Sequence, residues 1–498
     1  MSIFSWQFLL FTAGALLLYY LLHRKGQWAV LLCLSLGFFY AFGALAVLGV
    51  LCALAAVTFG AGLLLDRLNA GADGRKARGK KRLVLTVCLL LSFGLLFGVR
   101  YWDPTAGAQK GAELSLPVNA LLLPLAMSFC TLQSVGYVID CFRGKYPAQR
   151  DPLKYLLFVS FFPQTVQGPI SRWDELAPQL LKTHRWDPDS VKYGIQLALW
   201  GCLKKLLLAD RAAPVVRAVF GAPERWGGFA YGLAVLFYCI QLYCEFSGGV
   251  DLTRGVAQMF GIQLAESVRR PIFADSLADY WGRWLITLGT WMRDYVYEPM
   301  VGSKAGAALG RRIGGRFGEA AGRRFSAACA ALAVGLLVGL WHGTSLRFLF
   351  FGCYHGAILA ASVLLTERFS RWRKGLGLRD GQPFLRVLRL LRTLCIVFVG
   401  RYLTRAPRLL TAFSMLKKTV LHPCFYQLKD GTLAGFGLTG LDYAVVGLGV
   451  TALLLLEWRQ EKGVEIRKDL ERRSAFVQWL AIFLPLLALS LHLILWPI

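Results

Sequence analysis

Charged residues are scarce in this sequence: Asp, Glu, Lys and Arg make up 17% of its 498 residues, whereas soluble proteins carry about 25%. Hydrophobic residues make up 56%, and apolar runs of roughly 18–20 residues, each long enough to cross a bilayer, recur from end to end. This composition excludes a soluble globular enzyme, a disordered chain and a small disulfide-built domain. It predicts a polytopic membrane protein.

Acidic residues are especially few, with 29 Asp and Glu against 56 Lys and Arg and a net charge of +27. On a soluble protein this surplus would suggest nucleic-acid binding, but in a membrane protein it is better explained by cytoplasmic loops that retain Lys and Arg. Residues 66–82 carry seven basic and two acidic residues, so we expect them in the cytoplasm. Three crossings fit before them (4–22, 28–46 and 47–65), which predicts that the N-terminus lies outside.

The sequence motifs of soluble catalysis and of metal binding are absent. The twelve cysteines form no C-x-x-C pair, so neither a zinc site nor a redox dithiol is expected. No G-x-S-x-G or H-E-x-x-H motif occurs, and no dinucleotide-binding glycine pattern follows a predicted strand. We therefore predict neither a metal nor a bound cofactor.

Two segments depart from the pattern of simple crossings. Residues 156–170 are apolar but short and are interrupted by Pro163 and Pro169, which fits either a re-entrant segment covered by protein or a membrane-surface loop. In 280–297 tryptophans recur at helical spacing, which is typical of an amphipathic interfacial helix. We expect about eleven transmembrane helices plus these re-entrant or interfacial pieces, all in one domain spanning 1–498.

The most informative polar residue at membrane depth is His342. It follows the apolar run 331–340, and around it Gly335, Gly339 and Gly343 repeat every four residues, a smooth face on which a neighbouring helix can pack closely. An imidazole beside this face would point into the packed interior. The alternative is a structural histidine hydrogen-bonded at a helix end. His355 is a second candidate of the same kind.

The chemistry that such a histidine offers is general-base catalysis, because an imidazole with a pKa near 6.5 accepts protons at neutral pH. No Ser or Cys motif marks a covalent nucleophile. We therefore infer direct transfer, in which His342 deprotonates an acceptor hydroxyl that attacks an activated acyl group. The competing hypothesis is a transporter or lipid flippase, in which His342 and the broken segment near Pro163 line a path for a lipid-linked or anionic substrate.

Five ordered motifs resemble the membrane-bound O-acyltransferase (MBOAT) family, in particular the branch that contains the alginate O-acetylation membrane subunit. They read SFCTLQS at 128–134, FFPQ at 161–164, QLYCEFSG at 241–248, WGRW at 281–284 and GLWHG at 339–343. The resemblance extends over about 120–360. The branch that attaches D-alanine to teichoic acid shares this framework, so D-alanyl transfer is an alternative.

The resemblance implies an all-α fold around a funnel that thins the membrane, with His342 at the base of the funnel. It implies an acyl donor, acetyl-CoA or another acyl thioester, that approaches from the cytosol, and an extracytoplasmic polysaccharide acceptor. A hydrolase-like partner protein would pass the acyl group to that polymer. The expected setting is a bacterial plasma membrane, crossed many times.

One position departs from the family pattern. The family has a second histidine in a Trp-His-Ile-Ser motif, but here the residues are Trp284, Leu285, Ile286 and Thr287. Leucine cannot accept a proton. Either the histidine of this Trp-His-Ile-Ser motif is auxiliary in the family, or His355 substitutes for it here, or the activity of this chain is altered. A third functional hypothesis is therefore a catalytically weakened scaffold that recruits a partner on the outer face.

Supporting residues are expected around His342. Arg283 and Arg293 could neutralise the phosphates of a CoA-like donor, or extend to the membrane interface. Asp251 and Asp294 are expected to pair with nearby arginines. The donor-binding or funnel-lining candidates are Trp341, Arg283, Trp284, Arg293, Asp294, Gln241, Ser247 and Asp251.

Overall fold

The computed structural model describes residues 3–22, 24–71, 75–101, 118–165, 167–377 and 382–495. Over these ranges the chain forms helices and no strand, apart from an isolated antiparallel bridge between Val268 and Trp284. The predicted all-α class is therefore confirmed.

Within the described ranges, six helices are long and apolar enough to cross a membrane. They are Val47–Ala70, Lys76–Gly98, Gly228–Met259, Glu319–His342, Leu346–Gly375 and Gly440–Glu461. Shorter apolar helical stretches cover Trp6–Leu21, Gln27–Ala41 and Phe476–Ser490; the second of these and Val47–Ala70 are parts of one helix, Gln27–Ala70. The predicted multi-pass character is confirmed, and the number of about eleven crossings stays a prediction.

The chain folds as two compact units, so the single domain over 1–498 also stays a prediction. Unit 1 comprises Met1–Cys202 and Gly249–Glu266, and unit 2 comprises Leu203–Gly248 and Ser267–Ile498. The helices of unit 1 are α1 (Trp6–Leu21), α2 (Gln27–Ala70), α3 (Arg75–Tyr101), α4 (Val118–Phe142), α5 (Pro152–Ser160), α6 (Trp173–Leu181), α7 (Pro188–Cys202) and the last turns of α9 (Gly228–Met259).

Helix α2 differs from expectation, because it runs without interruption through residues 46 and 47, where two crossings were expected to meet. The sequence around this point contains no proline and no charge that would end a helix. Aromatic rings fill the core beside it: Tyr137 lies 4.7 Å from Tyr155, and Phe158 lies 5.0 Å from Trp173, between ring centroids.

The described parts of the broken segment, 156–165 and 167–170, are mostly buried inside unit 1. Helix α5 ends at Ser160, and a short 3₁₀ turn follows over Phe162–Gln164. Gln133 donates to the Phe158 carbonyl at 2.6 Å, and Gln164 donates to Gln133 Oε1 at 2.9 Å. Protein covers much of this irregular backbone and bonds its polar groups, as a re-entrant segment requires, and the choice between a re-entrant segment and a membrane-surface loop stays a prediction.

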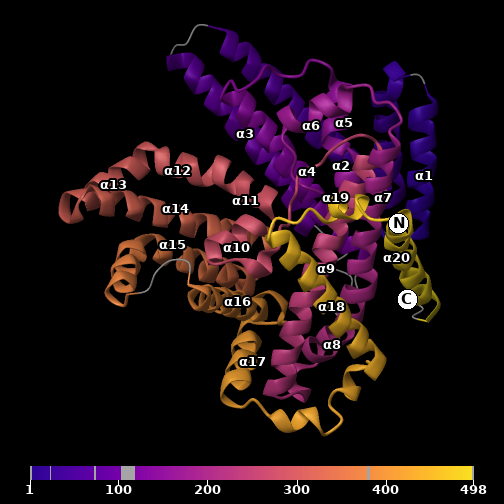
Figure 1. Ribbon diagram of the computed structural model, residues 1–498. Coiled ribbons are helices and arrows are strands. Elements are labelled where there is room, and N and C mark those ends of the chain that lie inside the picture. Colours follow the sequence, from indigo (N-terminus) through magenta and orange to yellow (C-terminus); the bar gives the residue numbers. More distant parts are fainter. Residues whose placement is uncertain are drawn as a thin grey trace, which may run out of the picture. The chain divides into compact units, whose positions relative to one another are not determined.

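Unit 2 contains the remaining helices, drawn from magenta through salmon and orange to yellow in Figure 1. They are α8 (Asp210–Gly221), the first turns of α9, α10 (Leu277–Arg283), α11 (Ile286–Met292), α12 (Glu298–Gly302), α13 (Lys304–Phe317), α14 (Glu319–His342), α15 (Leu346–Gly375), α16 (Pro383–Arg405), α17 (Leu409–Leu421), α18 (Gly440–Glu461), α19 (Ile466–Glu471) and α20 (Ala475–Leu495). Helices α13, α14 and α15 run back and forth beside one another (Figure 1).

The predicted interfacial helix over 280–297 is wrong in one respect: it is not continuous. Helix α10 ends at Arg283 and α11 begins at Ile286, because Leu285 adopts a left-handed conformation with φ 55°. Backbone hydrogen bonds to residues 267–269 stabilise this break: Arg269 N donates to Arg283 O, and Ile286 N donates to Ser267 O, both at 2.8 Å. Tryptophan spacing alone could not reveal these long-range hydrogen bonds.

Candidate active site

The hairpin of α14 and α15 is built on glycines. A Cβ on Gly335 would lie 2.6 Å from the Cα of Gly356, and one on Gly339 would lie 2.5 Å from the Phe348 carbonyl oxygen. Real Cβ atoms do not approach backbone so closely, so these positions admit only glycine at this helix separation. The predicted glycine face therefore packs against a neighbouring helix, α15, and fixes where the end of α14 lies.

His342 is the last residue of α14 and is half-buried. Its ring lies 4.8 Å from Trp341, 6.1 Å from Phe348 and 5.5 Å from Phe351, between centroids. The imidazole thus sits among aromatic rings without being sealed off from its surroundings.

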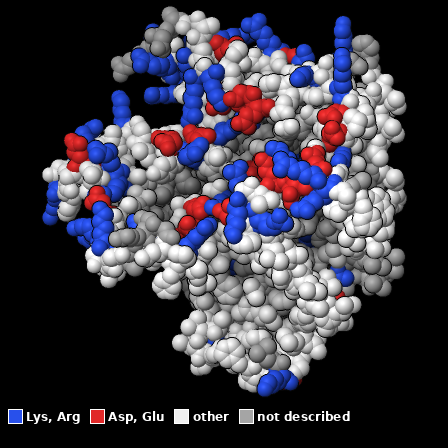
Figure 2. Space-filling model, viewed as in Figure 1, with Lys and Arg blue, Asp and Glu red and all other residues white. Residues whose placement is uncertain are grey.

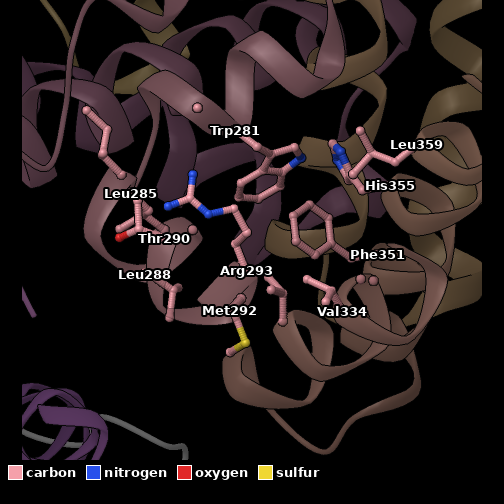
Figure 3. Close-up of a pocket in the computed structure, with 16 residues that line it drawn as sticks. Trp281, Leu285, Leu288, Thr290, Met292, Arg293, Val334, Phe351, His355 and Leu359 are labelled. Atoms are coloured by element: carbon pink, nitrogen blue, oxygen red, sulfur yellow. The ribbon is translucent and has the colours of Figure 1, made fainter. Parts of the chain in front are cut away.

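A cavity of about 350 Å³ lies in unit 2 between α10–α11 and the α14–α15 hairpin (Figure 3). Its walls are mostly apolar, with Leu285, Met292, Val334 and Phe351 among them. The polar side chains in its lining are Trp281, Thr290, Arg293 and His355. His342 is not part of this lining, but its neighbour Phe351 is.

His355 is the candidate histidine that the cavity contains. Its side chain is 4% exposed, and its ring lies 4.6 Å from Phe351 and 5.4 Å from Trp281, between centroids. Gly400 of α16 makes room for it, since a Cβ there would lie 2.6 Å from Nε2. Phe351 therefore contacts both imidazoles, that of His355 inside the cavity and that of His342 outside it.

Leu285 lines the same cavity and is 5% exposed. This is the position at which the family pattern has a histidine. The residue that departs from the pattern and the histidine that could substitute for it thus lie in the walls of one cavity (Figure 3).

The two candidate arginines lie in different surroundings. Arg293 lines the cavity, its side chain is 60% exposed, and its Nε donates to Asp294 at 3.0 Å. Arg283 instead bonds Asp279 at 2.9 Å and both carboxylate oxygens of Glu461 at 3.0 Å. Burial alone would lower the pKa of Arg283. The hydrogen bonds and charges of these carboxylates together outweigh burial, so the pKa is raised above its usual value.

The other candidates from the sequence do not line this cavity. Trp341 packs on His342, Trp284 packs 5.4 Å from Phe246, and Gln241 has a buried Oε1 without a hydrogen-bond partner among the described residues. Ser247 Oγ accepts a hydrogen bond from the buried Lys204 at 3.0 Å. Asp251, in unit 1, pairs with Arg254 at 3.9 Å, so both expected aspartate–arginine pairs are present.

Sequence reasoning missed Arg401 of α16, which is 8% exposed and donates to the Tyr280 hydroxyl at 2.6 Å. Burial is the main cause that raises the pKa of Tyr280, so the phenol stays neutral and supplies no negative charge to this guanidinium. An available signal was the presence of a charged residue inside the apolar run 388–403.

Comparison with known proteins agrees with these observations. Residues 84–312 match the model of the membrane-bound O-acyltransferase family. The chain is 29% identical to the probable alginate O-acetylase AlgI of Azotobacter vinelandii, over 89% of this chain and 82% of the relative. It is 29% identical to the peptidoglycan O-acetyltransferase of Helicobacter pylori, over 48% of this chain and 47% of the relative. It is 24% identical to the teichoic acid D-alanyltransferase of Bacillus subtilis, over 58% of this chain and 70% of the relative.

Proposed function

Because this chain belongs to the membrane-bound O-acyltransferase family, we propose that it transfers an acetyl group from acetyl-CoA to an extracytoplasmic polysaccharide. The chain is a multi-pass acyltransferase. The choice of acetyl group is supported by relatives named for alginate and peptidoglycan O-acetylation.

The observation that supports the proposal is that two histidines pack against the ring of Phe351. His355 lines the cavity at 4.6 Å from that ring, and His342 packs against the same ring at 5.5 Å. A thioester in the cavity would bring its acyl carbon beside Phe351. The acceptor would approach the half-buried imidazole of His342 at the end of α14.

His342 is the proposed general base. It takes the proton from an acceptor hydroxyl, and the hydroxyl oxygen attacks the acyl carbon while the carbonyl electrons move onto the carbonyl oxygen. When the carbonyl re-forms, the carbon–sulfur bond breaks and the CoA thiolate leaves with the electron pair. The thiolate takes the proton from the imidazolium, so the products are an acetyl ester and a free thiol.

Arg293 is the proposed phosphate contact of the donor. It lies in the cavity wall and is largely exposed, so it can reach a phosphate outside while the acyl end lies within. Arg283 is already bonded to Asp279 and Glu461 and is proposed to hold α10 in place.

The outside N-terminus was predicted from three crossings before residues 66–82, and it loses that support because two of those crossings form the single helix α2. The proposed topology is a bacterial plasma membrane with donor access from the cytosol. Basic segments support it, because cytoplasmic loops retain Lys and Arg. In unit 2, Arg311, Arg312 and Arg316 of α13 are exposed, and Lys and Arg side chains gather over the region where Figure 1 labels α13 (Figure 2). A hydrolase-like protein on the outer face is the proposed partner that hands the acetyl group to the polymer.

The test is release of free thiol when the purified protein is incubated with acetyl-CoA and an acceptor oligosaccharide. Wild type is expected to release thiol, and His342→Ala to lose at least about 10²-fold, the usual contribution of a general base. His422→Ala is the matched control, because His422 is exposed and lies outside the site. Equal rates for wild type and His342→Ala would remove His342 from the mechanism, and no thiol release by wild type would reject the donor.

A D-alanyl thioester is the second candidate donor, favoured by the relative named teichoic acid D-alanyltransferase. Competition decides between the two, because only the true donor is consumed when both thioesters are supplied at equal concentration.

A further inference from the structure

Two buried nitrogen atoms in the cavity wall lack hydrogen-bond partners among the described residues. They are Nε1 of the Trp281 indole and Nδ1 of the His355 imidazole. The two rings lie 5.4 Å apart between centroids and meet nearly at right angles, 85°. In Figure 3 the indole nitrogen is turned toward the imidazole.

Buried polar groups without partners are uncommon in folded proteins, and each calls for an explanation. An indole N–H can only donate, and a neutral imidazole can carry its proton on Nδ1 and donate as well. A group that satisfies both must therefore be a hydrogen-bond acceptor. Because most of the surrounding wall is apolar, a small neutral acceptor fits better than a charged one.

We propose that Trp281 and His355 together bind the carbonyl oxygen of the acyl donor. This inference rests on the proposed acyl transfer and adds the contact that holds the reacting group. As the acceptor attacks, the carbonyl electron pair moves onto this oxygen, and two N–H donors stabilise the negative charge that develops there. The charge returns to the carbon–oxygen double bond when the thiolate leaves.

The arrangement also orients the donor. Arg293 is exposed, whereas His355 is almost fully buried, and Trp281 lies between them in the cavity (Figure 3). A donor with its phosphates at Arg293 would therefore place its acyl end at the two nitrogens. Trp281 and His355 are thus assigned to the carbonyl, and His342 stays the base that acts on the acceptor.

The experiment compares binding of two unreactive donor analogues to the protein in lipid nanodiscs. S-acetonyl-CoA carries a ketone, and S-propyl-CoA lacks it. Wild type is expected to bind the ketone more tightly by roughly 2- to 10-fold per hydrogen bond. Trp281→Phe keeps the ring but removes the N–H, so this preference should shrink and kcat for thiol release should fall on the order of 10²-fold.

Trp226→Phe is the control, since it also removes an indole N–H, bonded here to Ala218 O at 3.0 Å, but from outside the cavity. It should keep both the ketone preference and kcat. A second pair of variants guards against misfolding: His355→Asn retains an N–H donor and should keep part of the preference, whereas His355→Leu should lose it.

The outcomes separate this inference from the proposed function. If wild type releases thiol but Trp281→Phe and His355→Leu keep both kcat and the ketone preference, the carbonyl assignment is overturned while acyl transfer stands. If wild type neither releases thiol nor distinguishes the two analogues, the proposed donor itself is rejected.

Discussion

At the scale of single residues, Leu285 is the least typical feature of the site. It holds a left-handed backbone with φ 55°, which a branched apolar residue rarely adopts and which costs roughly 1–2 kcal/mol. It also lines the cavity where the family pattern has an imidazole. The left-handed turn at this position therefore places the side chain of residue 285 in the wall of the cavity.

Leu285→His tests whether this chain is a weakened enzyme. Histidine tolerates the left-handed region better than leucine, so the variant should fold. If His342 already supplies the base, thiol release should change by less than about tenfold. A gain of 10² or more, the size expected when a missing general base is restored, would favour the scaffold hypothesis.

The Arg283–Glu461 contact gives a prediction about stability. Removing the arginine in Arg283→Ala leaves the mostly buried Glu461 with Arg270 as a cationic partner, at 3.0 Å. We expect a loss of about 1–3 kcal/mol, measured as a lower melting temperature in detergent. Arg283→Lys, which keeps a positive charge near Glu461, should lose less than Arg283→Ala; an equal loss would contradict this explanation.

At the scale of elements, the α14–α15 hairpin depends on close glycine packing. Gly335→Ala would place its Cβ 2.6 Å from the Cα of Gly356, so the helices must separate. We expect a loss of about 1–3 kcal/mol together with reduced activity, because both histidines belong to this hairpin.

The matched control for that variant is Gly447→Ala in α18, where a new Cβ would meet nothing within 4 Å. It should be neutral or stabilising by up to about 1 kcal/mol, the difference in helix propensity between the two residues. Thermal unfolding of both variants decides the matter, and equal losses would show that the glycine contact is not what holds the hairpin.

The elements also show what the sequence could and could not predict. The glycine face on Gly335 and Gly339 was predictable because helical periodicity is local. The break at Leu285 was not, because backbone bonds from 267–269 create it. The partner of Arg283 lies 178 residues away, a distance over which residue spacing carries no information.

At the scale of the whole molecule, the charge balance bears on the donor. The net charge is +27, and CoA carries phosphates, so we expect long-range attraction to assist donor capture. Screening shortens the reach of charges from about 10 Å at 0.1 M salt to about 3 Å at 1 M.

Salt should therefore raise the KM for acetyl-CoA by roughly threefold or more over this range, with kcat nearly constant. Arg293→Gln should start from a higher KM and respond less to salt, because Arg293 is the exposed cation of the cavity wall. Steady-state kinetics at both salt concentrations test this. A variant with the same KM and the same salt response as wild type would exclude Arg293 from donor binding.

The central claim is that His342 is the base in the transfer of an acyl group from a donor on one face of the membrane to an acceptor on the other. The most direct measurement uses sealed vesicles with radiolabelled acetyl-CoA on the side of the basic segments and the acceptor oligosaccharide, with any outer-face partner, on the opposite side. Wild type and His422→Ala should label the acceptor, and His342→Ala should leave it unlabelled while its vesicles stay sealed. Labelling by His342→Ala at the wild-type rate would contradict the account.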